Sequence, residues 1–352
     1  MAKAKKDAKP KADKAQKKAD RQARASDDSS WPRKILTACG ALGAGVAVAA
    51  LKERQDTVEK ILPTEEVLAL LPKPAPAKLW VSHADHHHEP ASKSVACVRR
   101  EEDVEANSCM PADTCARYVM DNLAKPQDVA VVRDMLQWLV AEAFGGGAGP
   151  PSVVDLHTGT ISYKDKFVLL QKLMDFKNLT FTEEQVAAYN AVRDSVHSKA
   201  RELFQAPGLK AEMSFFSHIN STKAAQNTHD EYWHPHIDTE QYSTFAVTSI
   251  LYLNEHTAEY DGGAFRFADD DRAAKEALGG SGGGAWSAVQ PKQGRIVMFS
   301  SGRENVHHVE PVTAGVRMGL TMAFTCSQAK ADSVMAWDGG PGSAALEMEE
   351  EA

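Results

Sequence analysis

The chain has 352 residues, of which 43% are hydrophobic and 25% are charged, and its formal net charge is −8. These values are ordinary for a globular protein and allow one large domain with additional segments. The first 34 residues hold 12 Lys and Arg against five Asp, a charge of +7, whereas the remainder carries 28 basic and 43 acidic side chains, a charge of −15. Because an acidic body repels phosphate, we expect no nucleic-acid partner.

The N-terminal segments predict attachment to a membrane. Residues 1–34 are predicted to be a disordered basic head, since they have almost no large apolar side chain to bury. Residues 35–51 carry no charge and would span roughly 26 Å as a helix, enough for a thin bilayer. The basic head favours a cytoplasmic N-terminus, and therefore a single-pass type II protein with a transmembrane signal-anchor. A cleaved signal peptide ending near Ala47-Val48-Ala49, an organellar targeting sequence and a soluble helix are the alternatives.

Residues 52–108 are predicted to be a stalk, because they include a Pro-rich stretch that forms a semi-rigid spacer. The histidines at positions 83 and 86–88 lie in this segment, and we expect a solvated loop there rather than the catalytic metal site. Four cysteines remain outside the apolar run, and a luminal body would favour one or two disulfides among three possible connectivities. In a cytosolic chain they would be free thiols. These cysteines are Cys97, Cys109, Cys115 and Cys326.

A folded domain is predicted over 109–330, followed by an acidic tail over 331–352. Helical periodicity begins near Ala116 and predicts a first helix. The capping box Thr182-Glu-Glu-Gln185 predicts the start of a second helix. After residue 210 the apolar period changes from 3.6 to 2, so that strands follow helices and the domain is of the α+β class, with a sandwich or barrel as its β part. The predicted strands are Met213–Ile219, Tyr232–Asp238, Phe245–Leu253, Ala264–Phe267, Arg295–Phe299, His307–Val312 and Val316–Thr325.

Candidate metal ligands lie in the segment Tyr-Trp-His-Pro-His-Ile-Asp at 232–238. As an extended strand, this segment places the side chains of His236 and Asp238 on one face, roughly 6.5–7 Å apart. A His and a carboxylate from one strand, with a second His from a later strand, fit the 2-His-1-carboxylate triad of non-haem Fe(II) oxygenases. His234 shares that face but lacks a carboxylate two residues further on, so it is the weaker candidate.

The second half of the constellation is predicted near the C-terminus. His307 lies 71 residues after His236, and Arg317 lies ten residues after His307. A turn at 311–315 would let the next strand run back antiparallel, so that Arg317 points into the cavity that His307 faces. A buried guanidinium needs an anionic partner. A dicarboxylate bound to the metal at one end and to Arg317 at the other would satisfy both groups. The alternative is an Arg paired with a surface carboxylate, beside two core histidines.

Five segments in order resemble the strands of the prolyl-4-hydroxylase-type 2-oxoglutarate- and Fe(II)-dependent oxygenases. They are His236-Ile-Asp238, Leu251-Tyr-Leu-Asn254, Gly262-Gly-Ala-Phe-Arg-Phe267, Pro291–Phe299 and His307–Arg317. The resemblance covers roughly 210–328 and implies a double-stranded β-helix (jelly-roll) core with the N-terminal helices packed on it. The family spacing His-x-Val-x-Pro-Val implies His307 rather than His308 as the distal ligand. It also implies that Arg317 binds the C5-carboxylate of 2-oxoglutarate, where many prolyl hydroxylases carry Lys.

The resemblance further implies a dioxygenase that uses Fe(II), 2-oxoglutarate, O2 and ascorbate. His236, Asp238 and His307 would hold the iron, and a protein or peptide side chain would be hydroxylated with release of succinate and CO2. It also implies a luminal catalytic domain in the ER or Golgi. Two sequons, Asn178-Leu-Thr180 and Asn220-Ser-Thr222, agree with a glycoprotein. The alternatives are a catalytically silent jelly-roll binding module and an iron enzyme that does not use 2-oxoglutarate.

Overall fold

A computed structural model of the chain describes residues 62–73, 76–99, 107–144, 151–156, 159–163, 166–226, 230–277 and 284–331. The predicted basic head, the predicted membrane segment at 35–51 and the acidic tail after residue 331 lie outside these ranges. In the described part, no helix combines the length and the apolar character needed to cross a bilayer.

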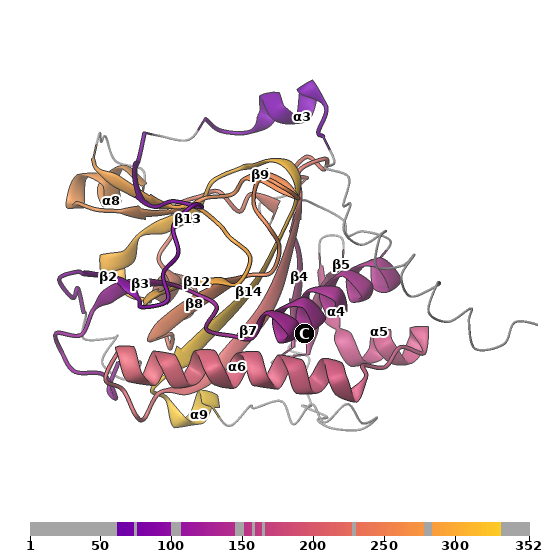
Figure 1. The fold of residues 1–352 in the computed structure, drawn as a ribbon, viewed down its shortest axis with the longest axis horizontal. Coiled ribbons are helices and arrows are strands. Elements are labelled where there is room, and N and C mark those ends of the chain that lie inside the picture. The colour runs from indigo at the N-terminus through magenta and orange to yellow at the C-terminus, as the bar shows by residue number, and fades with distance from the viewer. Residues whose placement is uncertain are drawn as a thin grey trace, which may run out of the picture. The chain divides into compact units, whose positions relative to one another are not determined.

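Two β-sheets organise the described residues (Figure 1). The larger sheet has, in spatial order, β2 (Ala91–Ser94), β3 (Ala116–Asp121), β12 (Arg295–Ser300), β8 (Val247–Tyr252), β14 (Val312–Thr325), β7 (Lys210–Asn220), β4 (Pro151–Asp155), β5 (Thr160–Tyr163) and β6 (Lys166–Leu169), with β9 (Tyr260–Gly262) paired to the start of β14. The smaller sheet has the order β1 (Lys78–Val81), β11 (Trp286–Val289), β10 (Phe265–Ala268) and β13 (His307–Val309). Most neighbours are antiparallel; β1 and β11 are parallel.

An apolar core lies between the two sheets. The ring of Phe299 on β12 lies 5.5 Å from that of Phe265 and 5.3 Å from that of Phe267, both on β10. Burying each such side chain stabilises the fold by roughly 1.5–3 kcal/mol. Two sheets that face each other across an apolar layer agree with the jelly-roll core that the sequence predicts.

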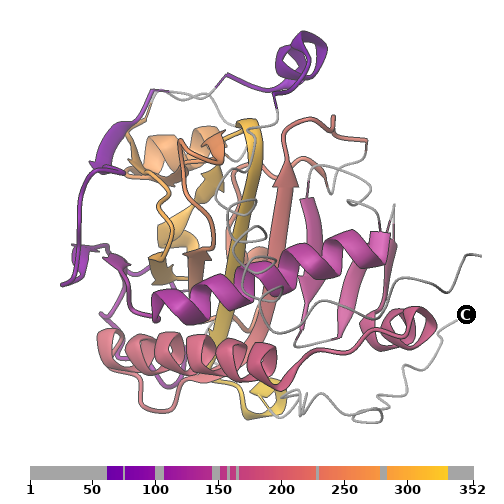
Figure 2. The same cartoon turned by 45° about the vertical axis from the view of Figure 1, so that its right-hand side comes forward.

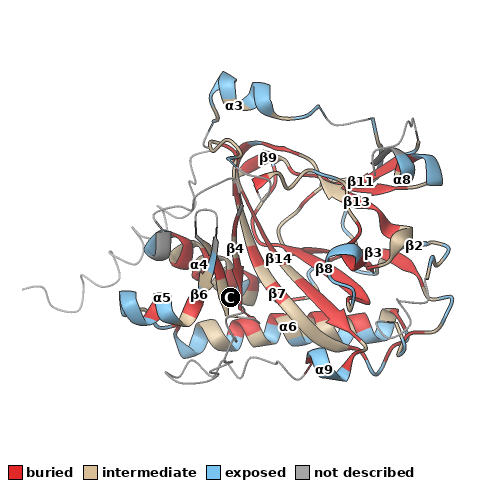
Figure 3. Cartoon of the chain, turned by 180° about the vertical axis from the view of Figure 1, so that it is seen from behind, coloured by how far each residue is buried: buried red, intermediate tan, exposed pale blue. Residues whose placement is uncertain are grey.

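A second core lies on the opposite face of the larger sheet, under the helices. Figures 1 and 2 show α4 (Pro126–Phe144) and α6 (Glu183–Leu203) side by side across this face. The predicted capping box is present, since the Thr182 hydroxyl accepts from the Gln185 amide and the Gln185 side chain accepts from the Thr182 amide. The remaining helices are α3 (Glu65–Leu70), α5 (Leu170–Lys177), α7 (Asp238–Gln241), α8 (Asp271–Ala277), α9 (Gln328–Ala331) and the 3-10 turn η3 (Arg303–Asn305). Figure 3 shows buried strands and helix faces turned toward them, with α3 largely exposed.

Strands occur before residue 210, where the sequence predicts helices. β3 occupies 116–121 between β2 and β12, and β4, β5 and β6 extend the larger sheet beyond β7. These strands are only four to six residues long, too short for an apolar period of 2 to be recognised. The predicted order of helices first and strands afterwards is therefore wrong.

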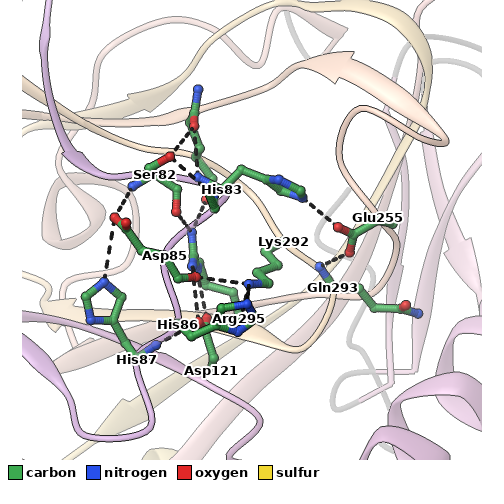
Figure 4. A network of polar contacts seen from close by, with 12 residues as sticks. Ser82, His83, Asp85, His86, His87, Asp121, Glu255, Lys292, Gln293 and Arg295 are labelled. Carbon is green, nitrogen blue, oxygen red and sulfur yellow. Dashed lines mark hydrogen bonds and ion pairs between the residues drawn. The ribbon is translucent and has the colours of Figure 1, made fainter.

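The predicted stalk contributes to both sheets. β1 pairs with β11, and β2 pairs with β3. The loop between them is held by Arg295, whose guanidinium donates to the carbonyls of Ser82 and Asp85 (Figure 4). Residues 78–94 therefore belong to the fold, and the nearby histidines 83 and 86–88 form no metal-binding group in the described residues.

Two disulfides link segments near β3 and β14. One joins the residues after β2 to the start of β3, and the other joins the segment before β3 to the end of β14. Cys97 pairs with Cys115, and Cys109 pairs with Cys326, with Cα–Cα distances of 5.3 Å in both. The second bond closes a separation of 217 residues. The connectivity that the sequence left open is thereby assigned.

The ion pair between Arg295 and Asp121 generates a test of the fold. Arg295 Nε donates to Asp121 Oδ1 at 2.8 Å and Nη2 donates to Oδ2 at 3.1 Å, and the side chains are 0% and 2% exposed. We expect Asp121→Asn to lower the free energy of unfolding by about 3–5 kcal/mol, because it leaves a buried charge without its partner. Urea denaturation measures this quantity.

The matched control is Asp194→Asn, because Asp194 pairs with Arg193 at the surface and is 67% exposed. This variant should change the free energy of unfolding by less than about 0.5 kcal/mol. A loss of under about 1 kcal/mol in Asp121→Asn would contradict the structural role of the buried pair.

Candidate metal centre

A single β-bridge brings the two candidate histidines together. The amide of His236 donates to the His307 carbonyl at 2.9 Å, and the amide of His307 donates to the His236 carbonyl at 3.0 Å. The centroids of the two imidazoles are consequently 4.3 Å apart. Residues 71 positions apart in sequence thus present adjacent rings.

The predicted strand at 232–238 is wrong, since only His236 makes a bridge and Asp238 begins the short helix α7. Pro235 cannot donate to a strand ladder, whereas Asp is favoured in the first turn of a helix. The Asp238 carboxylate still reaches the histidines: its Oδ1 is 3.6 Å from His236 Nε2 and 3.4 Å from His307 Nε2.

Both imidazoles are oriented by main-chain carbonyls two residues earlier. His236 Nδ1 donates to the His234 carbonyl at 3.0 Å, and His307 Nδ1 donates to the Asn305 carbonyl at 2.8 Å. Because a carbonyl only accepts, the proton of each neutral ring lies on Nδ1 and the lone pair lies on Nε2. Both lone pairs therefore face the Asp238 carboxylate.

The outer carboxylate oxygen of Asp238 is held by a hydroxyl pair. Thr248 Oγ1 donates to Asp238 Oδ2 at 2.6 Å and lies 2.8 Å from Ser301 Oγ, from which it accepts. Thr248 comes from β8, so the larger sheet orients the carboxylate. Oδ1 is left to face the histidines, as a metal-binding carboxylate with an outer hydrogen-bond partner does.

The pKa values of His236 and Asp238 are both shifted down. Burial lowers the pKa of His236, and the neighbouring His307 lowers it further. Burial alone would raise the pKa of Asp238, but attraction to the imidazoles of His307 and His236 in their protonated form, together with the Thr248 hydrogen bond, holds it below its usual value. His307 packs against three phenylalanine rings, at centroid distances of 5.1 Å (Phe265), 6.3 Å (Phe267) and 4.7 Å (Phe299).

The three side chains fit one metal ion. One ligand atom from each of His236, Asp238 and His307 lies within 4.8 Å of the others, and no other such group occurs among the described residues. Two imidazole nitrogens and one carboxylate oxygen suit Fe(II), with further positions open to other ligands. Their role as ligands remains a prediction from the sequence.

Arg317 lies on the inner face of β14, 2% exposed, with its guanidinium 5.0 Å from the Tyr252 ring. Within the described residues, its Nε and Nη2 have no hydrogen-bond partner, and the same holds for the hydroxyls of Tyr252 and Tyr260. Both tyrosines are fully buried, and their phenol pKa values are raised by burial and lowered in part by the charge of Arg317. Because unsatisfied buried donors are costly, these groups fit a carboxylate that accepts from them.

Strand β8 connects the two halves of the site. Register pairs Thr248 with Ala323, Ile250 with Thr321 and Tyr252 with Gly319, so all six residues share the inner face. Thr248 holds Asp238 and Tyr252 lies beside Arg317, roughly 13 Å of strand apart. The small residues of β14 leave room between them.

The strand topology that places Arg317 in the interior differs from the predicted one. β13 and β14 are not antiparallel neighbours: β13 pairs with β10 in the smaller sheet, whereas β14 pairs with β7 and β8 in the larger one. His307 and Arg317 thus approach the interior from opposite sheets. Gly263, at φ +67°, permits this, since a Cβ there would lie 2.7 Å from Arg317 Cδ.

The two other histidines in these motifs face elsewhere. The side chain of His234 is 61% exposed and contacts Glu231 Oε2 at 2.6 Å. His308 packs against Trp286, with ring centroids 5.2 Å apart. The sequence missed Thr248, Ser301 and Asn305, because Thr, Ser and Asn are too common for one position to signal a role.

The chain is similar to proteins of one family. A family model described as the 2OG-Fe(II) oxygenase superfamily matches residues 222–325. Proteins named 2-oxoglutarate and iron-dependent oxygenase domain-containing protein 3 are 32% identical over 254 residues in Xenopus tropicalis (71% of this chain, 73% of that protein) and 35% identical over 226 residues in Rattus norvegicus (62% and 65%). The chain thus spans about two thirds of the length of these relatives.

Two prolyl hydroxylases show more limited similarity. Prolyl 3-hydroxylase 1 of Gallus gallus is 41% identical over 78 residues, which are 22% of this chain and 9% of that protein. A solved prolyl-4-hydroxylase from Pseudomonas putida has 17% sequence identity and a TM-score of 0.35, and the match covers 59% of this chain and 91% of that one.

The hydrogen bond from Thr248 to Asp238 generates a test of the metal centre. We expect Thr248→Val to weaken Fe(II) binding by roughly 10- to 100-fold, because Oδ2 loses the donor that orients the carboxylate. Anaerobic titration with Fe(II) measures the dissociation constant.

Thr244→Val is the matched control, because the Thr244 hydroxyl donates to Glu212 and touches none of the three candidate ligands. Its Fe(II) affinity should equal that of the wild type. Equal affinities in all three proteins would contradict the orienting role of Thr248.

Proposed function

Because this chain belongs to the 2OG-Fe(II) oxygenase superfamily, whose members use Fe(II), 2-oxoglutarate and O2, we propose that it is a 2-oxoglutarate-dependent dioxygenase that hydroxylates a protein or peptide side chain. His236, Asp238 and His307 hold the iron, and Arg317 binds the distal carboxylate of 2-oxoglutarate. One observation carries the proposal. Three metal-ligand atoms lie within 4.8 Å of one another, and a buried guanidinium with unpaired donors lies on β14, the strand beside the one whose Thr248 holds Asp238.

The proposed site has a metal-binding end and a carboxylate-binding end. Bound Fe(II) supplies the activation of O2 that couples decarboxylation of 2-oxoglutarate to hydroxylation. At the metal end, main-chain carbonyls orient the two imidazoles and Thr248 orients the Asp238 carboxylate. The metal-binding atoms are therefore in place before iron or 2-oxoglutarate binds. At the other end, Arg317 and the hydroxyls of Tyr252 and Tyr260 receive a carboxylate. The phenylalanines around His307 exclude water from that side of the ring.

A protein or peptide substrate is supported by the relatives. The proteins named prolyl 3-hydroxylase carry, by their name, an activity on prolyl residues, and one of them is 41% identical to this chain over 78 residues. The side chain of His236 is 32% exposed, so one candidate metal ligand is accessible from solvent. An extended polypeptide could present one side chain there.

The proposed location is the lumen of the ER or Golgi, with the chain held by a membrane anchor at 35–51. The charge asymmetry around that apolar run supports this orientation. Two disulfides in the folded domain support an oxidising compartment. Ascorbate is proposed as the reductant that returns oxidised iron to Fe(II).

Uncoupled turnover tests the activity without a known substrate. With Fe(II), 2-oxoglutarate and O2, the purified protein should release succinate, and His236→Ala should abolish this release by removing a ligand. His234→Ala is the control, because that side chain points to Glu231, and it should retain wild-type turnover.

Arg317→Ala separates the remaining alternatives. In a dioxygenase that uses 2-oxoglutarate, this variant should raise the KM for 2-oxoglutarate by on the order of 10-fold or more, since a charge-assisted hydrogen bond is lost. Unchanged turnover would indicate an iron enzyme without this co-substrate. No succinate from the wild type, together with no binding of 2-oxoglutarate, would contradict the proposed function.

Glycosylation tests the luminal location. Asn178 is exposed at the C-terminus of α5, whereas the Asn220 side-chain oxygen accepts from the amide and hydroxyl of Thr222 at 2.9 and 2.7 Å. We expect a glycan at Asn178 and none at Asn220 when the full chain is made in secretory cells. Mass spectrometry, with Asn178→Gln as the control, detects it; a chain without any glycan would contradict the luminal orientation.

A further inference from the structure

The main chain of β8 leaves β14 one residue before it reaches Arg317. The amide of Leu253 donates to the Met318 carbonyl at 3.0 Å. The carbonyl of Leu253, however, accepts from Gln293 Nε2 at 3.1 Å instead of from β14. The chain is therefore turned toward the 293–294 loop at this point.

The next residues are held away from β14. The Glu255 carboxylate is 2.5 Å from His83 Nε2 and accepts from the Gln293 amide at 2.9 Å (Figure 4). Its own amide donates to Glu259 at 2.6 Å. The carboxylate of Glu255 thus belongs to the network around the 82–88 loop, and its main chain bonds to Glu259 and does not continue the ladder beside Arg317.

The side chain of Asn254 occupies the place that the main chain leaves. Its Nδ2 donates to the Val316 carbonyl at 2.8 Å, and its Oδ1 accepts from the Met318 amide at 2.9 Å. These two groups flank Arg317 and point to the same edge of β14. The carboxamide is 1% exposed, so both bonds are protected from water.

The other edge of β14 is held by a strand. Arg317 is paired with Ile219 in the regular register between β14 and β7. The main chain at Arg317 is therefore fixed on one side by a strand and on the other by a single amide side chain. A shift of this main chain would move a guanidinium that is confined between Gly263 and the Tyr252 ring.

We propose that Asn254 is a positioning residue for the 2-oxoglutarate site. It sets the main chain of β14 so that the Arg317 guanidinium meets the distal carboxylate of the co-substrate. This role rests on the proposed function, because that function makes 2-oxoglutarate the ligand of Arg317. Asn254 itself touches neither the metal ligands nor the guanidinium: its bonds go to the main chain on either side.

A hydrogen bond to a strand also stabilises a fold, and a comparable bond provides the control. Ser249, on β8 and 0% exposed, donates its hydroxyl to the Met322 carbonyl of β14 at 3.2 Å. This bond lies five residues beyond Arg317 along β14. Ser249→Ala therefore removes a buried side-chain bond to the same strand, β14, away from the carboxylate site.

The experiment compares two 2-oxoacids that differ only at the distal end. Full-length protein with Fe(II), kept anaerobic, is titrated with 2-oxoglutarate and with 2-oxovalerate, which has a methyl group in place of the distal carboxylate. The wild type should prefer 2-oxoglutarate by on the order of 10- to 100-fold, the contribution of hydrogen bonds to a charged group. The ratio of the two dissociation constants on one preparation is independent of the folded fraction.

We expect Asn254→Ala to reduce this ratio by about 10-fold through weaker binding of 2-oxoglutarate, with 2-oxovalerate binding unchanged. Ser249→Ala should retain the wild-type ratio. Asn254→Ser is a milder change in case the alanine variant does not fold, and it should reduce the ratio in the same direction.

Equal weakening of both acids in the Asn254 variants, or the same loss of preference in Ser249→Ala, would overturn the role of Asn254 and leave the proposed function intact. A wild type that binds neither acid would reject the proposed function and this role with it.

Discussion

The site depends on the pair of main-chain hydrogen bonds that join His236 to His307. Each amide donates to the carbonyl of the other residue, at 2.9 and 3.0 Å, and no second pair extends the bridge in the described residues. Such bonds contribute only about 1 kcal/mol each, so the bridge is stable because both sides of it are held by packing. On one side, His307 is embedded among phenylalanines between the sheets; on the other, α7 begins two residues later and brings Asp238 to the rings.

The site carries charged groups at two ends. At one end a carboxylate faces two neutral imidazoles, and at the other a buried guanidinium has donors without partners. A fold selected only for stability would pair such a charge or place it in water, since a buried unpaired charge costs several kcal/mol. A cation bound by the carboxylate and imidazoles, and a dicarboxylate paired with the guanidinium, would account for this arrangement. The orientation of each group is set in advance by carbonyls, hydroxyls and strand register.

The sequence predicted which side chains would lie together better than it predicted the path of the chain. His236, Asp238, His307 and Arg317 are residue types with few roles in an apolar setting, so their motifs could be recognised. The conformation of 232–238 was missed, because a two-residue spacing suggested a strand whereas a bridge followed by a helix also brings the side chains together. Strands β4 to β6 were missed because they are short, and β1 and β2 because they lie in a charged, Pro-containing segment. The membrane segment at 35–51 stays a prediction. Thr248 and Asn254 act through side-chain hydrogen bonds and Asn305 through its main-chain carbonyl, and only the fold brings these groups to their partners.

The central claim is that one iron is held by three side chains that the bridge between His236 and His307 assembles. Crystals grown anaerobically with Fe(II), measured on both sides of the iron absorption edge, locate that metal without reference to activity. The account predicts one anomalous peak within bonding distance of both Nε2 atoms and of Asp238 Oδ1. A peak elsewhere, such as at the histidines of the 83–88 loop, or no peak at the three side chains would contradict it.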